Sequence, residues 1–235
     1  GQLGFVDGDG AGDADHARTI ADSPPGVRRA APADVRQPAN RLRRLAKRTR
    51  RRSDGDMTNF NRILCVDVEM TCWEGPPPEG EVAEIIALGV VDLRTDSLEI
   101  RREQLYLVKP ALSRISPFCS TLTGLTPKEL EKAPPLAEVL RAVRKTFAQG
   151  DWCAWGRDDE LIAENCDRVG SALPFPGLFH DMAAQFRLLL GLTYRPGLDE
   201  ALARFGLDFE GQEHDALADA RNLARLVVEL ARRLR

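Results

Sequence analysis

Residues 62–70, RILCVDVEM, constrain the fold more than any other part of the sequence. The segment is short, apolar and rich in β-branched residues, which is typical of a buried strand. It also carries Asp67 and Glu69, whose i, i+2 spacing places both carboxylates on one face of a strand. Two like charges in a buried strand are costly unless a partner compensates them. The sequence therefore predicts either a solvent-exposed strand end or a site for a hard divalent cation, which prefers oxygen ligands.

Strand and helix signals continue along the rest of the chain. Further strands are expected at 84–93, 98–110, 151–156 and 179–182. Helices are expected at 116–124, 126–133, 135–148, 158–170, 183–191, 197–207 and 215–235. Strands that first form a meander and then alternate with helices predict an α/β fold, a mixed sheet with helices on its faces. We assign this domain to residues 57–235.

Residues 1–56 differ in composition from the rest of the chain. They carry 12 Lys/Arg and 8 Asp/Glu, a net charge of +4, which leaves −7 for residues 57–235. Without a hydrophobic period, such a segment cannot bury enough apolar surface to offset the entropy of ordering. We predict a disordered extension that is Arg-rich at 41–52. That run is interpreted first as a solvated tail, with an arm that holds nucleic acid by its phosphates as the alternative.

The sequence also argues against several classes of protein. It has no apolar run of about 18 residues, the length that a transmembrane helix requires, and no secretory signal pattern. Its five cysteines are odd in number and never spaced CxxC, which gives little support to a disulfide framework or a Cys-rich zinc site. We therefore expect a cytoplasmic protein in a reducing compartment.

Acids recur in two later segments, each with an ordinary explanation when taken alone. In EHDALADA, at 213–220, His214 and Asp219 stand five residues apart around the start of the last helix. They read as a loop histidine and a surface acid. In WGRDDELI, at 155–162, Asp158 and Asp159 follow a short strand, where either would serve as a helix N-cap.

Together the three segments give the order Asp, Glu, Asp, His, Asp, and they resemble the three motifs of the DEDDh 3′–5′ exonuclease superfamily. VDVEMTCWEG resembles the first motif, WGRDD the second and HDALADA the third, whose pattern is H-x4-D. DVEMTCWE followed by FCSTLTGLT is most similar to the Eri-type and KapD-like exoribonuclease branch. The resemblance covers residues 60–235. It implies an RNase H-like, mixed five-stranded sheet in which an antiparallel meander precedes parallel strands, flanked by helices.

The resemblance also implies a role for each matched residue. The expected metal ligands are Asp67, Glu69, Asp159 and Asp219. Asp159 is preferred over Asp158 because the family's acid falls three residues after a small residue that corresponds to Gly156.

The remaining implied roles concern catalysis and the nucleotide. His214 is the expected general base, and Glu69 is a catalytic residue as a bridging metal ligand. The terminal nucleotide is expected to contact Glu69, Met70, Thr71 and His214. Met70 departs from the Ala or Phe that is usual in the family, which is expected to change the shape of the nucleotide pocket.

The implied reaction is phosphodiester hydrolysis assisted by two Mg²⁺ or Mn²⁺ ions, which releases nucleoside 5′-monophosphates from a 3′ end. The expected partner is single-stranded or 3′-overhang nucleic acid, with RNA favoured over DNA by the similarity to exoribonucleases. The motifs alone do not separate the two, because that choice depends on contacts to the 2′-OH. Two alternatives stay open: a DNA-directed repair or proofreading exonuclease, and a non-catalytic nucleic-acid-binding adaptor with the same fold.

Overall fold

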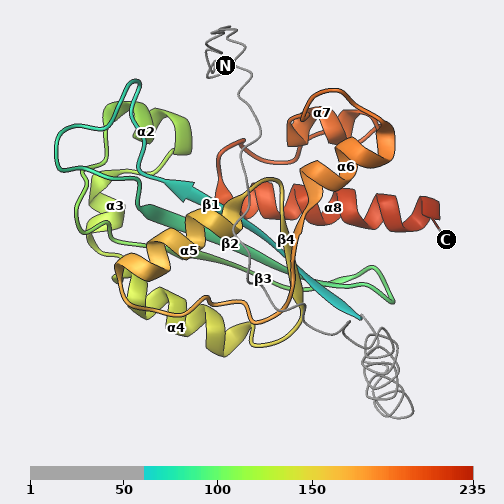
Figure 1. Cartoon of the computed structure of the whole chain (residues 1–235), viewed down its shortest axis with the longest axis horizontal. Helices are drawn as coiled ribbons and strands as arrows, with labels where there is room; N and C mark the ends of the chain where they lie inside the picture. The colour runs from blue at the N-terminus through green and yellow to red at the C-terminus, as the bar shows by residue number, and fades with distance from the viewer. Residues whose placement is uncertain (1–60, 235) are drawn as a thin grey trace, which may run out of the picture. The chain divides into compact units, whose positions relative to one another are not determined.

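The computed structural model describes residues 61–234, so the extension predicted at 1–56 lies outside the described residues and stays a prediction. A five-stranded sheet in the order β3-β2-β1-β4-β5 forms the centre of the described part (Figure 1). Its strands are β1 (Arg62–Met70), β2 (Ile85–Arg94), β3 (Ile100–Leu107), β4 (Asp151–Ala154) and β5 (Phe179–Asp181). The first three strands pair antiparallel, whereas β4 pairs parallel with both β1 and β5. The predicted mixed sheet, a meander followed by parallel strands, is confirmed.

Helices cover both faces of this sheet. They are α2 (Pro117–Thr123), α3 (Pro127–Glu131), α4 (Leu136–Thr146), α5 (Asp158–Arg168), α6 (Met182–Leu190), α7 (Leu198–Ala203) and α8 (Ala216–Leu234). Leu64 and Val66 of β1 belong to the core shared with α4 and α5. Ile63 and Cys65, the alternate residues, belong to the core shared with α6, α7 and α8. Because side chains alternate along a strand, Asp67 and Glu69 of β1 also point toward the α8 side of the sheet.

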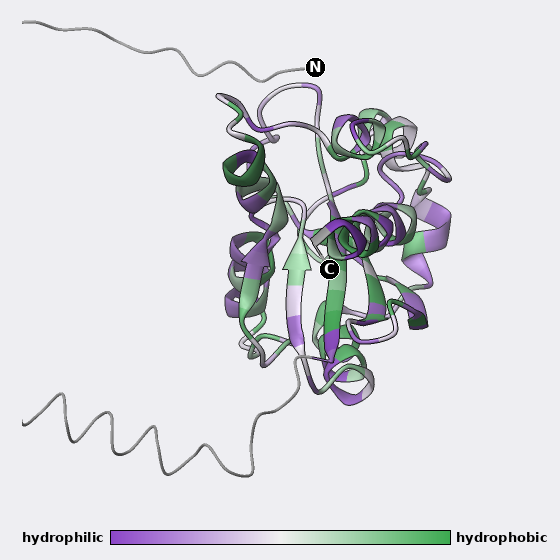
Figure 2. Ribbon diagram, turned by 90° about the vertical axis from the view of Figure 1, so that its right-hand side faces the viewer, coloured by the Kyte–Doolittle hydropathy of each residue, from purple (hydrophilic) through white to green (hydrophobic). Residues whose placement is uncertain are grey.

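Hydrophobic residues concentrate along the central strands, while the helices alternate apolar and polar positions (Figure 2). This pattern is expected of strands that are covered on both faces. Within residues 61–234, no helix is both long enough and apolar enough to cross a membrane. All five cysteines are free thiols.

Candidate active site

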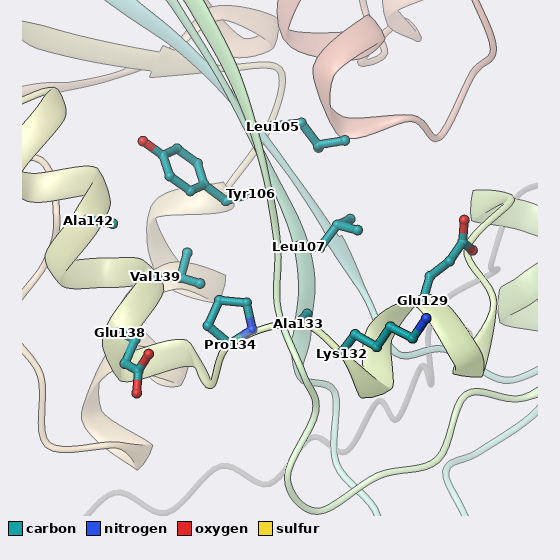
Figure 3. A pocket seen from close by; sticks show the side chains of 10 residues that line it. All are labelled: Leu105, Tyr106, Leu107, Glu129, Lys132, Ala133, Pro134, Glu138, Val139 and Ala142. Atoms are coloured by element: carbon teal, nitrogen blue, oxygen red, sulfur yellow. The ribbon is translucent and has the colours of Figure 1, made fainter.

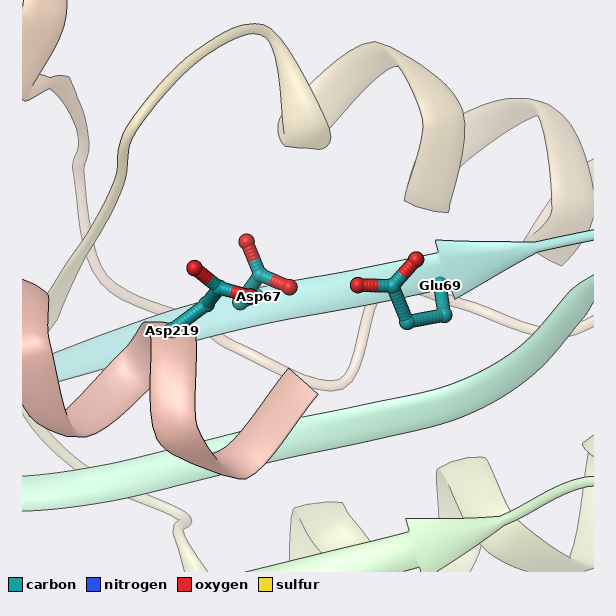
Figure 4. Close-up of side chains that lie close together, drawn as sticks. All are labelled: Asp67, Glu69 and Asp219. Carbon is teal, nitrogen blue, oxygen red and sulfur yellow. The ribbon is translucent and has the colours of Figure 1, made fainter. Parts of the chain in front are cut away.

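Three carboxylates from two elements converge on the α8 side of the sheet. Asp67 and Glu69 lie along β1, and Asp219 reaches them from the first turn of α8 (Figure 4). One carboxylate oxygen from each of the three residues lies within 4.8 Å of one carboxylate oxygen from each of the other two. The structure thus brings together three of the four predicted metal ligands, from positions 150 residues apart along the chain.

The start of α8 explains how Asp219 reaches the strand. Asp215 caps the helix, because its carboxylate accepts hydrogen bonds from the backbone N–H groups of Leu217 (3.0 Å) and Ala218 (2.9 Å). The backbone N–H of Asp219 donates to the Asp215 carbonyl at 2.9 Å, which closes the first turn. A cap of this kind fixes the helix start and its phase. Asp219 is therefore presented to β1 by a defined turn.

The three acids are protonated more readily than exposed carboxyls. Burial raises the pKa of Asp67 well above its usual range, and the negative charges of Asp158, Asp219 and Glu69 raise it further. Glu69 is 8% exposed, and burial together with neighbouring acids raises its pKa to about 8. Burial likewise raises the pKa of Asp219 to about 7, although a hydrogen bond from the His214 backbone opposes the shift. Mutually repelling, partly desolvated carboxylates of this kind are stabilised in their charged form by a cation.

Of the two acids at the start of α5, Asp158 is the one whose charge acts on this cluster, whereas Asp159 is the ligand predicted from the sequence. The charge of Asp158 raises the pKa of Asp67, of Glu69 and of Asp219, so its carboxylate lies beside the cluster. Asp158 also accepts a hydrogen bond from the backbone of Val68 on β1, and burial raises its own pKa to about 6.

Helix phase explains why Asp158 faces the cluster. The helix α5 begins at Asp158, and Asp158 precedes the buried Ile162 and Cys166 by four and eight residues, so all three lie on the face turned to the sheet. Asp159, the predicted ligand three residues after Gly156, lies one position further along, a rotation of about 100° around the helix.

His214 stands at the edge of the cluster. It is exposed, and its φ of 63° places it in the left-handed region, which few non-glycine residues adopt. It lines a cavity of about 300 Å³ together with Asp67, Glu69 and Asp219. The predicted catalytic histidine and three of the four predicted ligands thus line one cavity.

Met70 and Thr71, the two predicted substrate contacts that follow Glu69, differ in their surroundings. The Thr71 side chain is buried; its hydroxyl donates to the Val82 carbonyl (3.0 Å) and accepts from the Glu84 N–H (2.9 Å). Both bonds close the loop between β1 and β2, so the hydroxyl hydrogen of Thr71 is already used within the protein. Met70 is half-buried and packs against the core on the α4 and α5 side.

Several residues of the cavity wall were not singled out from the sequence. Trp155, Leu198 and Phe209 add apolar surface beside the acids. The Trp155 indole N–H donates to the Pro196 carbonyl at 3.1 Å, which fixes the ring orientation. Trp155 lies inside the WGRDD segment, so its signal was present in the sequence, whereas Phe209 follows from long-range packing alone.

A larger cavity of about 510 Å³ lies beside the edge strand β3 (Figure 3). Tyr106 and Val139 face it from β3 and α4, and Glu129 and Lys132 line it from the α3 region. Its lining contains none of the predicted site residues. Size therefore does not identify the chemically active cavity in this chain.

Comparison with known proteins agrees with this geometry. Residues 64–227 match the RNase_T family model, described as Exonuclease. The chain is similar to the 3′–5′ exonuclease Snipper of Drosophila melanogaster, with 29% identity over 222 residues that cover 83% of this chain and 78% of Snipper. It is also 29% identical to human 3′–5′ exoribonuclease 1 over 191 residues, 73% of this chain and 52% of the human protein. The chain thus spans about half the length of that relative.

Solved structures give the same result. The nuclease domain of 3′hExo, a DEDDh family member crystallised with rAMP, superposes with a TM-score of 0.68 and 28% identity. The match covers 75% of this chain and 94% of that domain. With the family match over most of the described residues, the chain belongs to the RNase_T exonuclease family and is a 3′–5′ exonuclease of the DEDDh type.

Proposed function

We propose that this enzyme removes nucleotides from the 3′ end of single-stranded or 3′-overhang RNA and releases nucleoside 5′-monophosphates. The observation that carries the proposal is the convergence of Asp67, Glu69 and Asp219 in one cavity with His214 at its edge. Asp158 acts on the same cluster from α5. Four acids and a histidine are a costly arrangement for a protein that only binds nucleic acid, so the adaptor alternative is disfavoured.

The donor set fits Mg²⁺ or Mn²⁺, because it consists of carboxylates alone and hard divalent cations prefer oxygen ligands. We assign Asp67, Glu69, Asp158 and Asp219 to hold two such ions, with Asp158 in place of Asp159. When bound, the ions would neutralise the phosphodiester charge and acidify the attacking water. The raised pKa values of Glu69 and Asp219 support this assignment, since a cation would offset both the burial and the repulsion that raise them.

The protein's own residues would orient the reactants. His214 would take the proton of the attacking water as general base, a task that suits neutral imidazole near pH 7. Its backbone N–H already binds Asp219, which ties the histidine loop to the acids. Trp155, Leu198 and Phe209 would provide an apolar wall for the terminal nucleoside.

RNA is proposed over DNA because of the relatives. Human 3′–5′ exoribonuclease 1 is named for its action on RNA, and the 3′hExo nuclease domain was crystallised with rAMP. The DNA-bound exonuclease structures are 16–19% identical to this chain and share the fold alone. We place the reaction in the cytoplasm, a compartment compatible with five free thiols.

A gel assay tests this function. The full chain is incubated with 5′-labelled RNA, DNA of the same sequence, and a duplex with a 3′ overhang, each with Mn²⁺, with Mg²⁺ or with EDTA. We expect an RNA ladder that shortens from the 3′ end, nucleoside 5′-monophosphate as product, and no cleavage in EDTA. Asp219→Asn is the control for contaminating nuclease. Faster digestion of DNA would favour the DNA-directed alternative, and binding without cleavage would favour the adaptor.

A further inference from the structure

The pairing between β1 and β2 becomes irregular just after Glu69. Glu69 pairs with Ala87 of β2, whereas the next residue, Met70, pairs with Ile85, so one residue of β2 is skipped. An irregularity of this kind bends the strand and interrupts the ladder of backbone hydrogen bonds. The position of the chain that leaves Glu69 therefore depends on contacts from outside the ladder.

Two side chains of the α2 region supply such contacts. The Ser116 hydroxyl donates to the carbonyl oxygen of Cys72 at 2.6 Å, and the Cys119 thiol donates to the carbonyl oxygen of Met70 at 3.6 Å. Ser116 is at the same time the N-cap of α2, because it accepts the Cys119 N–H at 2.9 Å. These two side chains, the anchors of this segment, are held in place: Ser116 by its role as helix cap, and Cys119 by its complete burial.

The opposite edge of the same segment is held by the chain before β2. The Thr71 N–H donates to the Glu84 carbonyl at 2.8 Å, and the Glu84 carboxylate accepts the N–H groups of Ala111, Leu112 and Ser113 at 2.7–2.9 Å. The contact at Thr71 is between backbone groups and does not require a particular side chain. The contacts from the α2 region do require one, since the groups that donate to the carbonyls of Met70 and Cys72 are the side chains of Ser116 and Cys119.

We propose that Ser116 and Cys119 are positioning residues of this exonuclease: they fix the backbone of residues 70–72 and thereby keep the Glu69 carboxylate aligned with Asp67 and Asp219. The inference rests on the proposed function, because its main measurement is turnover. Small displacements of groups that hold a reacting centre cost much more in rate than in stability. Loss of either anchor is therefore expected to affect the site more than the fold.

Paired variants separate positioning from packing. Cys119→Ala and Ser116→Ala each remove one donor, whereas Cys119→Ser and Ser116→Thr keep a hydroxyl donor at the same place. Cys166→Ala is the matched control, because it removes another buried thiol from the core beneath α5. Turnover of an RNA oligonucleotide, Mn²⁺ affinity by calorimetry and Tm are measured for every variant.

We expect kcat/KM to fall about threefold to tenfold in each alanine variant, in keeping with the loss of one hydrogen bond. Mn²⁺ affinity should fall in the same variants, and the conservative variants should recover most of both losses. Cys166→Ala should match the alanine variants in Tm while keeping the wild-type kcat/KM. Alanine variants within twofold of wild type, or conservative variants no better than alanine at equal Tm, would overturn the proposal. If the wild-type protein cleaves neither RNA nor DNA, the proposed function fails, and the Mn²⁺ affinities still decide whether these residues position Glu69.

Discussion

Gly89 of β2 lies directly against the backbone of Ala216 at the start of α8. A Cβ atom on Gly89 would lie 2.0 Å from the Ala216 carbonyl oxygen, far inside van der Waals contact. Gly89 is also the residue that pairs with Asp67 across the β1–β2 ladder. The missing side chain thus lets α8 approach the sheet at the level of Asp67, and Asp219 follows three residues later in the same helix.

Gly89→Ala is expected to move α8 away from β1. Because the neighbouring atoms belong to the backbone, the clash cannot be relieved by a rotamer change, and overpacking of this kind costs about 1–3 kcal/mol. We expect a lower free energy of unfolding in urea and weaker Mn²⁺ binding. Gly75→Ala is the control, since a Cβ atom there would meet nothing within 4 Å. Wild-type Mn²⁺ affinity in Gly89→Ala would show that Asp219 does not depend on this close approach.

Mn²⁺ affinity and turnover together distinguish the roles of the neighbouring acids Asp158 and Asp159 of α5. Asp158→Asn should lower Mn²⁺ affinity and turnover by at least about tenfold to hundredfold, the range that groups supporting a metal site commonly contribute. Asp159→Asn should stay close to wild type, because the charge that raises the pKa values of Asp67, Glu69 and Asp219 from α5 is that of Asp158. A large loss in Asp159→Asn together with wild-type behaviour of Asp158→Asn would show that Asp159 is the metal ligand from α5.

His214 is tested as a base with a substitution that suits its backbone. His214→Asn is chosen because asparagine tolerates the left-handed conformation seen at this residue. Loss of a general base typically lowers kcat by about 10²–10⁴-fold, while Mn²⁺ binding by the proposed carboxylate ligands should persist. Calorimetry of Mn²⁺ binding beside single-turnover rates distinguishes the roles. A loss of Mn²⁺ affinity as large as that of Asp219→Asn would make His214 a ligand.

The sequence predicts the strand that carries the site and most of its acids for a simple reason. Period-2 patterning and i, i+2 spacing are local, so residues 62–70 and the shared face of Asp67 and Glu69 follow from the chain itself. The choice between Asp158 and Asp159 depends on where α5 begins after the turn that follows β4. The role of Thr71 depends on Glu84, which is 13 residues away. Both are set by tertiary contacts that no local pattern contains.

The raised pKa values predict an unusual pH dependence for the metal-free protein. Glu69 and Asp219 have pKa values of about 8 and about 7 when folded, against 4.5 and 3.8 for the unperturbed groups. Between the unfolded and folded values the folded state binds more protons, so the free energy of unfolding falls as pH rises. The stabilisation from these two groups is complete below about pH 4 and is lost as pH passes through 7 and 8.

Urea titrations in EDTA at pH 5.5 and pH 8 measure this effect, with the double variant Glu69→Gln, Asp219→Asn as control. The wild type should lose more stability than the control between these two values of pH, because the amides do not titrate. Saturating Mn²⁺ should remove the loss, since the ion binds the deprotonated carboxylates and stabilises only the folded state. Calorimetry in buffers of different ionisation enthalpy should then detect protons released on Mn²⁺ binding near pH 7. An equal change in the free energy of unfolding between pH 5.5 and pH 8 for wild type and control, with no proton release, would show that these carboxylates are already charged without metal.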